Sequence, residues 1–123
     1  NISSVSGKKG TARFAAYNAS KFAVIGFTQA LASELGSSGI TVNSICPGLV
    51  NTERLPALSS ALLLDIDPED RQHAYTEKAM TSIPLGRLAT PLDVANTAAF
   101  LASKESDYLT GIALTVAGGM YMD

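Results

Sequence analysis

Three polar residues near the start of the chain, Ser4, Tyr17 and Lys21, have the types and the spacing of a proton-transfer site. Tyr17 and Lys21 lie four residues apart, which on a helix places both side chains on one face. A phenol is a poor base at neutral pH, and a nearby ammonium group stabilises its phenolate form. A serine hydroxyl could polarise a carbonyl without competing for the proton. The group therefore suits proton transfer to or from an alcohol oxygen while a cofactor carries the hydride.

The same residues allow two other interpretations. A tyrosine and a lysine at this spacing are also common on solvated helix faces. Ser4 or Ser20 beside Lys21 could form a Ser-Lys nucleophile pair, but neither serine is part of the Gly-x-Ser-x-Gly turn that many hydrolases use. The choice among these interpretations depends on the elements around the three residues.

Hydrophobic periodicity predicts the elements that would position these side chains. Residues 1–4 could close a strand, and a polar, glycine-bearing loop follows them. Apolar residues recur at three- and four-residue intervals over residues 15–35, which predicts one long helix. We expect Gly36 to end this helix in a left-handed conformation. A β-branched run then predicts a second strand over residues 40–46.

The second part of the chain predicts two short helices, a further helix and a last strand. Residues 49–89 are irregular and indicate two short helices around an acidic turn, an insertion of the kind that often forms a lid. Thr90 and Asp93 can form a capping box around a proline at the first helical position, which predicts a helix over 91–102. Residues 112–116 predict the last strand. Strands that alternate with helices favour an α/β fold with a parallel sheet.

The composition excludes several classes of protein. The 123 residues are 46% hydrophobic and 16% charged, with a net charge of -2, which is typical of a folded domain. The nine cations form no basic patch, so we expect no nucleic-acid partner. The single histidine, His73, and the single cysteine, Cys46, exclude a zinc finger and an internal disulfide, and we expect no metal site. No apolar run approaches the ~20 residues of a membrane span, and we expect a cytoplasmic protein.

Collinear motifs along the chain resemble one known family. They are Asn1-Ile2-Ser3-Ser4, Tyr17-Asn18-Ala19-Ser20-Lys21, Val42-Asn43-Ser44-Ile45-Cys46-Pro47-Gly48, Gly86-Arg87-Leu88, Pro91-Leu92-Asp93-Val94-Ala95, Phe100-Leu101-Ala102-Ser103, Thr110-Gly111 and Gly118-Gly119. Together they resemble the second half of the short-chain dehydrogenase/reductase family, in which a serine precedes the tyrosine by 13 residues, as Ser4 precedes Tyr17. The resemblance implies the C-terminal half of a Rossmann-type doubly wound parallel sheet, with three strands and crossover helices. Residues 1–123 would then be the C-terminal portion of a single domain.

The resemblance also implies roles for individual residues. Tyr17 would be the catalytic acid/base, Lys21 would stabilise its phenolate and hydrogen-bond the nicotinamide ribose, and Ser4 would orient the substrate oxygen. Further cofactor contacts are implied for Pro47, Gly48, Val50 and Thr52. The cofactor would be NAD or NADP, and the reaction would interconvert a secondary alcohol and a ketone.

The irregular segment 49–89 resembles the variable substrate loop of the family. Its leucines could line an apolar wall of the substrate site or simply bury the loop; they are Leu55, Leu58 and Leu62. The resemblance further implies a small-molecule alcohol or ketone as partner and a homodimer or homotetramer. The helix over 15–35 agrees with an oligomer, because it is apolar on more than one face.

One family feature is missing from the chain. No Gly-x-x-x-Gly-x-Gly or Gly-x-Gly-x-x-Gly turn is present to hold a cofactor diphosphate, and the chain opens without a methionine. We therefore expect the N-terminal cofactor-binding half to be absent from these residues. An alternative function is a truncated, inactive fragment that acts as an interaction or oligomerisation module through an exposed sheet edge. A nucleotide sensor that keeps the fold without the catalysis is a third alternative.

Overall fold

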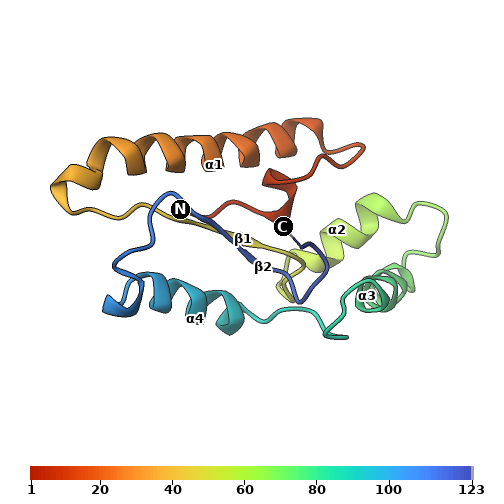
Figure 1. Cartoon of the computed structure of the whole chain (residues 1–123). Coiled ribbons are helices and arrows are strands. Elements are labelled where there is room, and N and C mark those ends of the chain that lie inside the picture. The colour runs from red at the N-terminus through yellow and green to blue at the C-terminus, as the bar shows by residue number, and fades with distance from the viewer. Residues whose placement is uncertain (123) are drawn as a thin grey trace.

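The computed structural model describes residues 1–122, apart from the side chains of residues 58, 61 and 62. Along the chain, one strand follows the first long helix, three α-helices come next, and a second strand follows them (Figure 1). The α-helices are α1 (Ala15–Leu35), α2 (Leu55–Leu62), α3 (Arg71–Thr81) and α4 (Pro91–Leu101), and the strands are β1 (Ser44–Pro47) and β2 (Ala113–Val116). Short 3-10 helices form η1 (Val5–Gly7), η2 (Gly36–Ser38) and η3 (Lys104–Ser106). The two short helices expected in the insertion are thus α2 and α3.

The strands β1 and β2 are parallel neighbours along their whole length. The sequence predicts a longer strand over 40–46, but β1 begins only at Ser44. The side chain of Asn43 accounts for the later start, since it takes the N–H of Ile112 that a longer ladder would use. Its Nδ2 donates to the carbonyl of Leu109 at 2.7 Å, and its Oδ1 accepts from the backbone N–H of Ile112 at 3.2 Å.

The N-terminal segment pairs with the opposite edge of β1. Ile2 and Ile45 form an isolated parallel bridge. The N–H of Ser3 donates to the carbonyl of Ile45 at 2.8 Å, and the N–H of Ile45 donates to the carbonyl of Asn1 at 3.0 Å. Three parallel segments are therefore present, but the expected first strand is reduced to a bridge because the chain turns into η1 at Val5.

Helices cover both faces of this small sheet. In Figure 1, α1 lies over one face and α4 over the other, while α2 and α3 lie beyond one end of the strands. The doubly wound α/β arrangement predicted from the sequence is thus confirmed. The fully buried Thr28 of α1 donates its hydroxyl to the carbonyl of Val24 at 2.7 Å and accepts from the side chain of Asn1 at 2.9 Å. This contact ties α1 to the N-terminal segment.

The helix α1 has the predicted bounds, but its end differs from the prediction. Gly36 has φ -57 and ψ -39, which is right-handed, so the expectation of a left-handed Gly36 is wrong. Its N–H still donates to the carbonyl of Ala32, and the chain therefore continues into η2 instead of reversing. The left-handed residue is Gly39, with φ 72, which closes η2.

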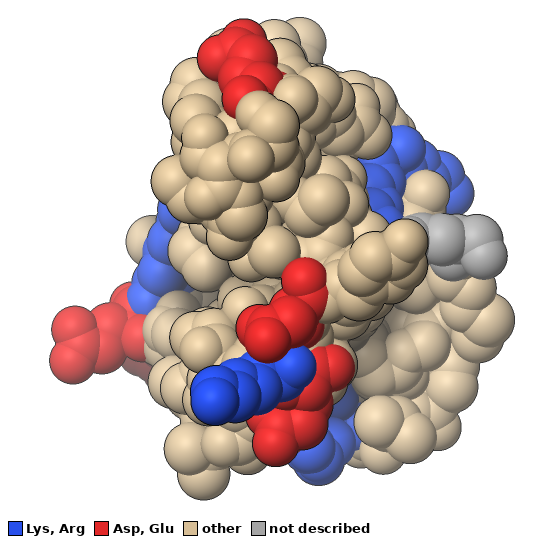
Figure 2. Space-filling view, turned by 60° about the vertical axis from the view of Figure 1, so that its left-hand side comes forward, with Lys and Arg blue, Asp and Glu red and all other residues tan. Residues whose placement is uncertain are grey.

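The surface carries exposed apolar side chains and dispersed charges. Phe22 and Phe27 of α1 are 45% and 60% exposed. On the face in Figure 2, charged side chains of both signs are interspersed among uncharged ones. Within residues 1–122, no helix is long and apolar enough to cross a membrane. The same residues hold no cluster of three or more metal-ligating side chains.

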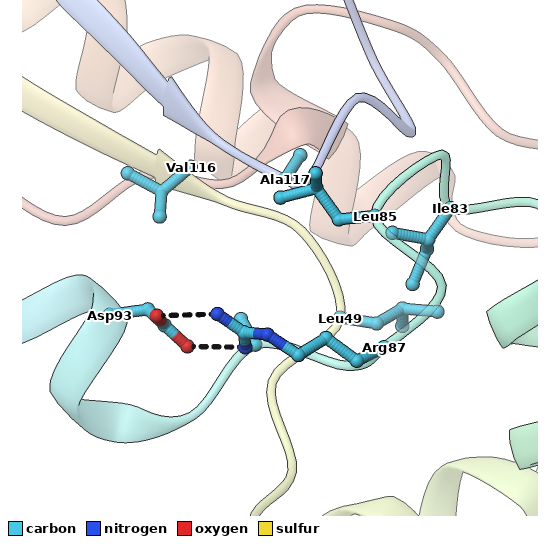
Figure 3. Close-up of a pocket in the computed structure, with 9 residues that line it drawn as sticks. Leu49, Ile83, Leu85, Arg87, Asp93, Val116 and Ala117 are labelled. Carbon is cyan, nitrogen blue, oxygen red and sulfur yellow. Dashed lines mark hydrogen bonds and ion pairs between the residues drawn. The ribbon is translucent and has the colours of Figure 1, made fainter.

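The start of α4 confirms the predicted capping box. The Thr90 side chain accepts from the N–H of Asp93 at 3.3 Å, and the Asp93 carboxylate accepts from the N–H of Thr90 at 2.6 Å. Arg87 also donates two side-chain hydrogen bonds to Asp93, at 2.8 and 2.9 Å, beside a small pocket (Figure 3). The hydrogen bonds from Arg87, together with those from Thr90, hold the pKa of Asp93 well below its usual range.

We predict that Asp93→Asn lowers the stability of the protein near neutral pH, because it weakens both the Arg87 pair and the Thr90 cap. A lowered folded-state pKa gives stability that is fully present above the unfolded-state value of about 3.9 and is lost as the pH falls below it. The difference in urea-unfolding free energy between wild type and variant should therefore shrink towards about pH 2. Asp107→Asn, at an exposed aspartate outside this cluster, is the control. A difference that is independent of pH would contradict the prediction.

Candidate active site

A cleft of about 540 Å³ opens where β1 ends. Its walls come from the N-terminal segment and η1, the start of α1, the loop after β1, the beginning of α2, one residue of α3 and Met120 near the other end of the chain. Ligands of open parallel sheets bind outside the carboxyl ends of the strands, and the cleft occupies such a position. It is the larger of the two pockets described and is therefore the candidate site.

Tyr17 and Lys21 both line this cleft from the first turns of α1. The Nζ of Lys21 lies 5.7 Å from the centroid of the Tyr17 ring and donates to the carbonyl of Ile2 at 3.3 Å. Phe14 packs its ring edge-on against Tyr17, with centroids 6.4 Å apart. The helix thus brings the predicted pair together, and the N-terminal segment and Phe14 restrict where the two side chains can lie.

Ser4 is close in sequence to the cleft but is not among the residues that line it. It is buried and caps η1, where its Oγ accepts from the N–H of Ser6 at 3.1 Å. The neighbouring Ser3 does line the cleft, and its hydroxyl donates to the carbonyl of Lys21 at 2.8 Å. In this structure the Ser4 hydroxyl is an acceptor for η1 and keeps its own proton available as a donor.

The buried Asn18 fixes the loop between η1 and α1. Its Oδ1 accepts from the N–H of Thr11 at 3.1 Å, and its Nδ2 donates to the carbonyls of Ser6 at 2.6 Å and Lys9 at 3.1 Å. One side chain therefore holds three backbone groups of a loop that would otherwise be free to move. The sequence does not predict this positioning role of Asn18, because an asparagine inside a helix has no local signal of such distant partners.

The four further residues that the family resemblance implies as cofactor contacts also line the cleft: Pro47, Gly48, Val50 and Thr52. Gly48 packs closely against the C-terminal turn, since a Cβ at this position would lie 2.9 Å from the Cβ of Ala117. Its N–H continues the sheet by donating to the carbonyl of Val116 at 2.9 Å. The small side chain of Ala117 thus faces a position that leaves no room for a side chain.

The insertion contributes cleft residues that the sequence analysis did not single out, namely Arg54 and Tyr75. Burial raises the pKa of the Tyr75 phenol, which therefore stays protonated near neutral pH. Leu55 is buried and also lines the cleft, so it fits both interpretations of the leucines. The side chains of Leu58 and Leu62 lie outside the described part of the structure.

The chain is similar to known proteins. A family model described as Enoyl-(Acyl carrier protein) reductase matches residues 1–121. The chain belongs to the short-chain dehydrogenase/reductase family. The family resemblance predicted from the sequence is therefore confirmed.

Curated members of this family are similar over nearly all of the chain. The 3-oxoacyl-(acyl-carrier-protein) reductase FabG of Vibrio cholerae is 43% identical over 122 residues, which cover 99% of this chain and 45% of the relative. The acetoacetyl-CoA reductase of Shinella zoogloeoides is 40% identical over 121 residues, covering 98% and 45%. The chain thus spans about half the length of the curated relatives it matches.

Solved structures of short-chain dehydrogenase/reductases share the fold. A variant of actinorhodin polyketide ketoreductase, solved with NADPH, superposes with a TM-score of 0.87 at 36% identity and covers 98% of this chain and 45% of its own. The ligand-free aldohexose dehydrogenase of Thermoplasma acidophilum gives a TM-score of 0.86 at 33% identity, covering 98% and 46%. The described residues therefore have the fold of the matching portion of Rossmann-type enzymes.

We predict that Gly7→Ala destabilises the natural-length protein, because η1 approaches α1 too closely for a side chain. A Cβ at Gly7 would overlap the Ser3 hydroxyl and lie 2.7 Å from the carbonyl oxygen of Lys21. Overpacking of this kind costs about 1–3 kcal/mol of unfolding free energy, measurable by urea titration. Gly10→Ala is the matched control, since its Cβ would meet nothing within 4 Å. Equal unfolding free energies for the two variants would contradict the close packing.

Proposed function

We propose that the protein is an NAD(P)-dependent oxidoreductase that interconverts a secondary alcohol and a ketone, with Ser4, Tyr17 and Lys21 as its catalytic group. The observation that carries the proposal is the joint position of Tyr17 and Lys21 on one cleft, with their two polar groups on the same helix face. Family membership supports an oxidoreductase. Because the chain covers about half of its relatives, the proposal concerns the protein at its natural length.

The residues of the cleft fit a nicotinamide nucleotide. The volume of the cleft, about 540 Å³, lies within the range of about 300–1,000 Å³ that is usual for ligand sites. The donors expected for a ribose and a carboxamide, the Lys21 ammonium and the Thr52 hydroxyl, lie along one cleft with the turn at Pro47 and Gly48. We propose that these residues, with Tyr17 and Val50, hold NAD or NADP. Such a cofactor, when bound, supplies or accepts the hydride.

The chain's own residues would handle the proton. In the direction of reduction, the Tyr17 hydroxyl donates its proton to the substrate oxygen, and in oxidation the phenolate accepts it. The Lys21 ammonium stabilises the phenolate, because an opposite charge at short range favours the ionised form. Ser4 donates its hydroxyl hydrogen to the same substrate oxygen and orients it. This last role requires a modest movement or opening at η1, since Ser4 does not line the cleft in this structure.

The insertion that contains α2 and α3 would cover the substrate. Its two ends are held together by hydrogen bonds from the N–H of Asn51 to the carbonyl of Ala89 at 2.8 Å and from the N–H of Ala89 to the carbonyl of Leu49 at 3.0 Å. A segment closed at its base in this way can change its inner side chains without disturbing the sheet. We propose that residues 49–89 form the substrate-binding loop and determine which alcohol or ketone is accepted.

We predict that Tyr17→Phe lowers the turnover of the natural-length enzyme by about 10²–10⁴-fold, the usual contribution of a positioned acid or base. The measurement is nicotinamide absorbance during reduction of a panel of small ketones. Tyr108→Phe is the matched control, because Tyr108 is fully exposed. Turnover within about twofold of wild type in Tyr17→Phe would refute the proton-transfer role.

Lys21→Met separates the two effects of the lysine in the same experiment. It is expected to lower turnover and also to weaken cofactor binding, whereas Tyr17→Phe changes turnover far more than cofactor binding. Cofactor affinity is measured by fluorescence titration with NADH and with NADPH, which also identifies the preferred nucleotide. Unchanged affinity for both nucleotides in Lys21→Met would contradict the proposed ribose contact.

We further propose a homodimer or homotetramer, with a second copy covering the exposed face of α1. Two phenylalanines exposed on one helix are costly in a monomer, and contact with a second copy would bury them. Phe27→Glu is expected to reduce the native mass measured by light scattering, because it places a charge in that interface. A monomeric wild-type protein at high concentration would refute this proposal.

A cytoplasmic location stays a prediction.

A further inference from the structure

The charges that line the cleft are all positive. Lys21 and Arg54 are the charged side chains among the described residues that line it, and no aspartate or glutamate does so. The adjacent Glu53 is exposed and is not part of the lining. Two cations without a carboxylate create a site that favours an anionic group.

Arg54 has no partner for its hydrogen-bond donors in the described structure. No hydrogen bond or ion pair involves its side chain among residues 1–122, and its contact is with an aromatic ring, since its Cζ lies 5.7 Å from the centroid of Tyr17. Lys21, the other cation, donates to the carbonyl of Ile2. In the described residues, the guanidinium of Arg54 therefore keeps all of its donors available to a ligand.

The local backbone aims Arg54 at the cleft. It directly precedes α2, and the turn before this helix is closed by a hydrogen bond from the N–H of Leu55 to the carbonyl of Thr52 at 3.0 Å. Thr52 and Leu55 both line the cleft, so the turn between them holds Arg54 at the same wall. The cation–π contact with Tyr17 keeps the guanidinium near the ring while its N–H donors stay free.

We propose that Arg54 binds the carboxylate of the substrate, and that this protein acts on short oxo acids and the corresponding hydroxy acids. The inference rests on the proposed function and names its substrate class. Arginine donates two parallel hydrogen bonds to a carboxylate, which fixes the orientation of the acid as well as its position. Because the guanidinium lies over the same ring whose hydroxyl would protonate the ketone, the carboxylate and the reacting carbon are only a few bonds apart.

The test compares acids with their methyl esters in the natural-length enzyme. Pyruvate, acetoacetate and levulinate place the carboxylate at increasing distances from the ketone, and each methyl ester removes the charge while keeping the ketone. The measured quantity is selectivity, the ratio of kcat/KM for the acid to kcat/KM for its ester. In Arg54→Met we expect selectivity for the best acid to fall at least about tenfold, the loss of a charge-assisted hydrogen bond. Arg54→Lys keeps the charge but cannot donate two parallel hydrogen bonds. Its selectivity is expected to lie between those of wild type and Arg54→Met.

Further measurements test whether the effect belongs to carboxylate binding by Arg54 and not to a change in net charge or in folding. Lys104→Met removes one positive charge from η3, outside the cleft, and should leave selectivity unchanged. Calorimetric titration with butyrate, which has the carboxylate but no ketone, measures anion binding without turnover. Wild type should bind butyrate at least about tenfold more tightly than Arg54→Met. Butyramide should bind wild type and Arg54→Met with equal affinity.

The outcomes distinguish this inference from the proposed function. Turnover of ketones with equal selectivity in wild type and Arg54→Met would overturn the carboxylate site and leave the oxidoreductase intact. Arg54-dependent binding of butyrate without turnover of any ketone would support the carboxylate site and refute the proposed function. A loss confined to the affinity for NADH or NADPH would assign Arg54 to a cofactor phosphate and overturn the inference.

Discussion

The packing of η1 against the first turns of α1 determines where the polar side chains of the cleft lie. The N-terminal segment and Lys21 exchange hydrogen bonds, because Ser3 donates to the backbone of Lys21 and the Lys21 ammonium donates to the backbone of Ile2. Asn18 holds the following loop on the same helix, and Gly7 allows the approach because it lacks a side chain. Strand, loop and helix are therefore positioned as one unit, and no single hydrogen bond carries the arrangement.

The strand β1 connects this unit to the rest of the molecule. One of its edges bonds the N-terminal segment and the other bonds β2, so its carboxyl end lies between the two parts of the chain that are most distant in sequence. The turn at Gly48 then packs on Ala117 and leads into the insertion that contains Arg54. The cleft thus has one wall built from the sheet and α1 and another built from the insertion, which is joined at its base and by a hydrogen bond from the N–H of Leu85 to the carbonyl of Gly118 at 3.1 Å. The first wall suits chemistry common to a family, and the second suits the choice of substrate.

The sequence predicts best those features that depend on neighbouring residues. The bounds of α1 follow from apolar periodicity, and the start of α4 follows from the pairing of Thr90 with Asp93, which is complete within one helical turn. The late start of β1 could not be predicted in this way, because the Asn43 side chain bonds residues more than sixty positions away. Gly36 permits a left-handed conformation without requiring one. Arg54 reaches the cleft only because the insertion folds back over Tyr17, and a single sequence carries no pattern for that contact.

The complete burial of Cys46 in the middle of the sheet makes this residue a native reporter of how the molecule opens. Cys46 pairs with Thr115 of β2, has no exposed surface, and is the single cysteine among the 123 residues. A thiol reagent can modify it only when the segments that cover it move apart, and the modification rate therefore counts such openings. Ligands that bind the cleft stabilise the closed form and should slow the labelling, so affinity can be read from a chemical rate without any turnover.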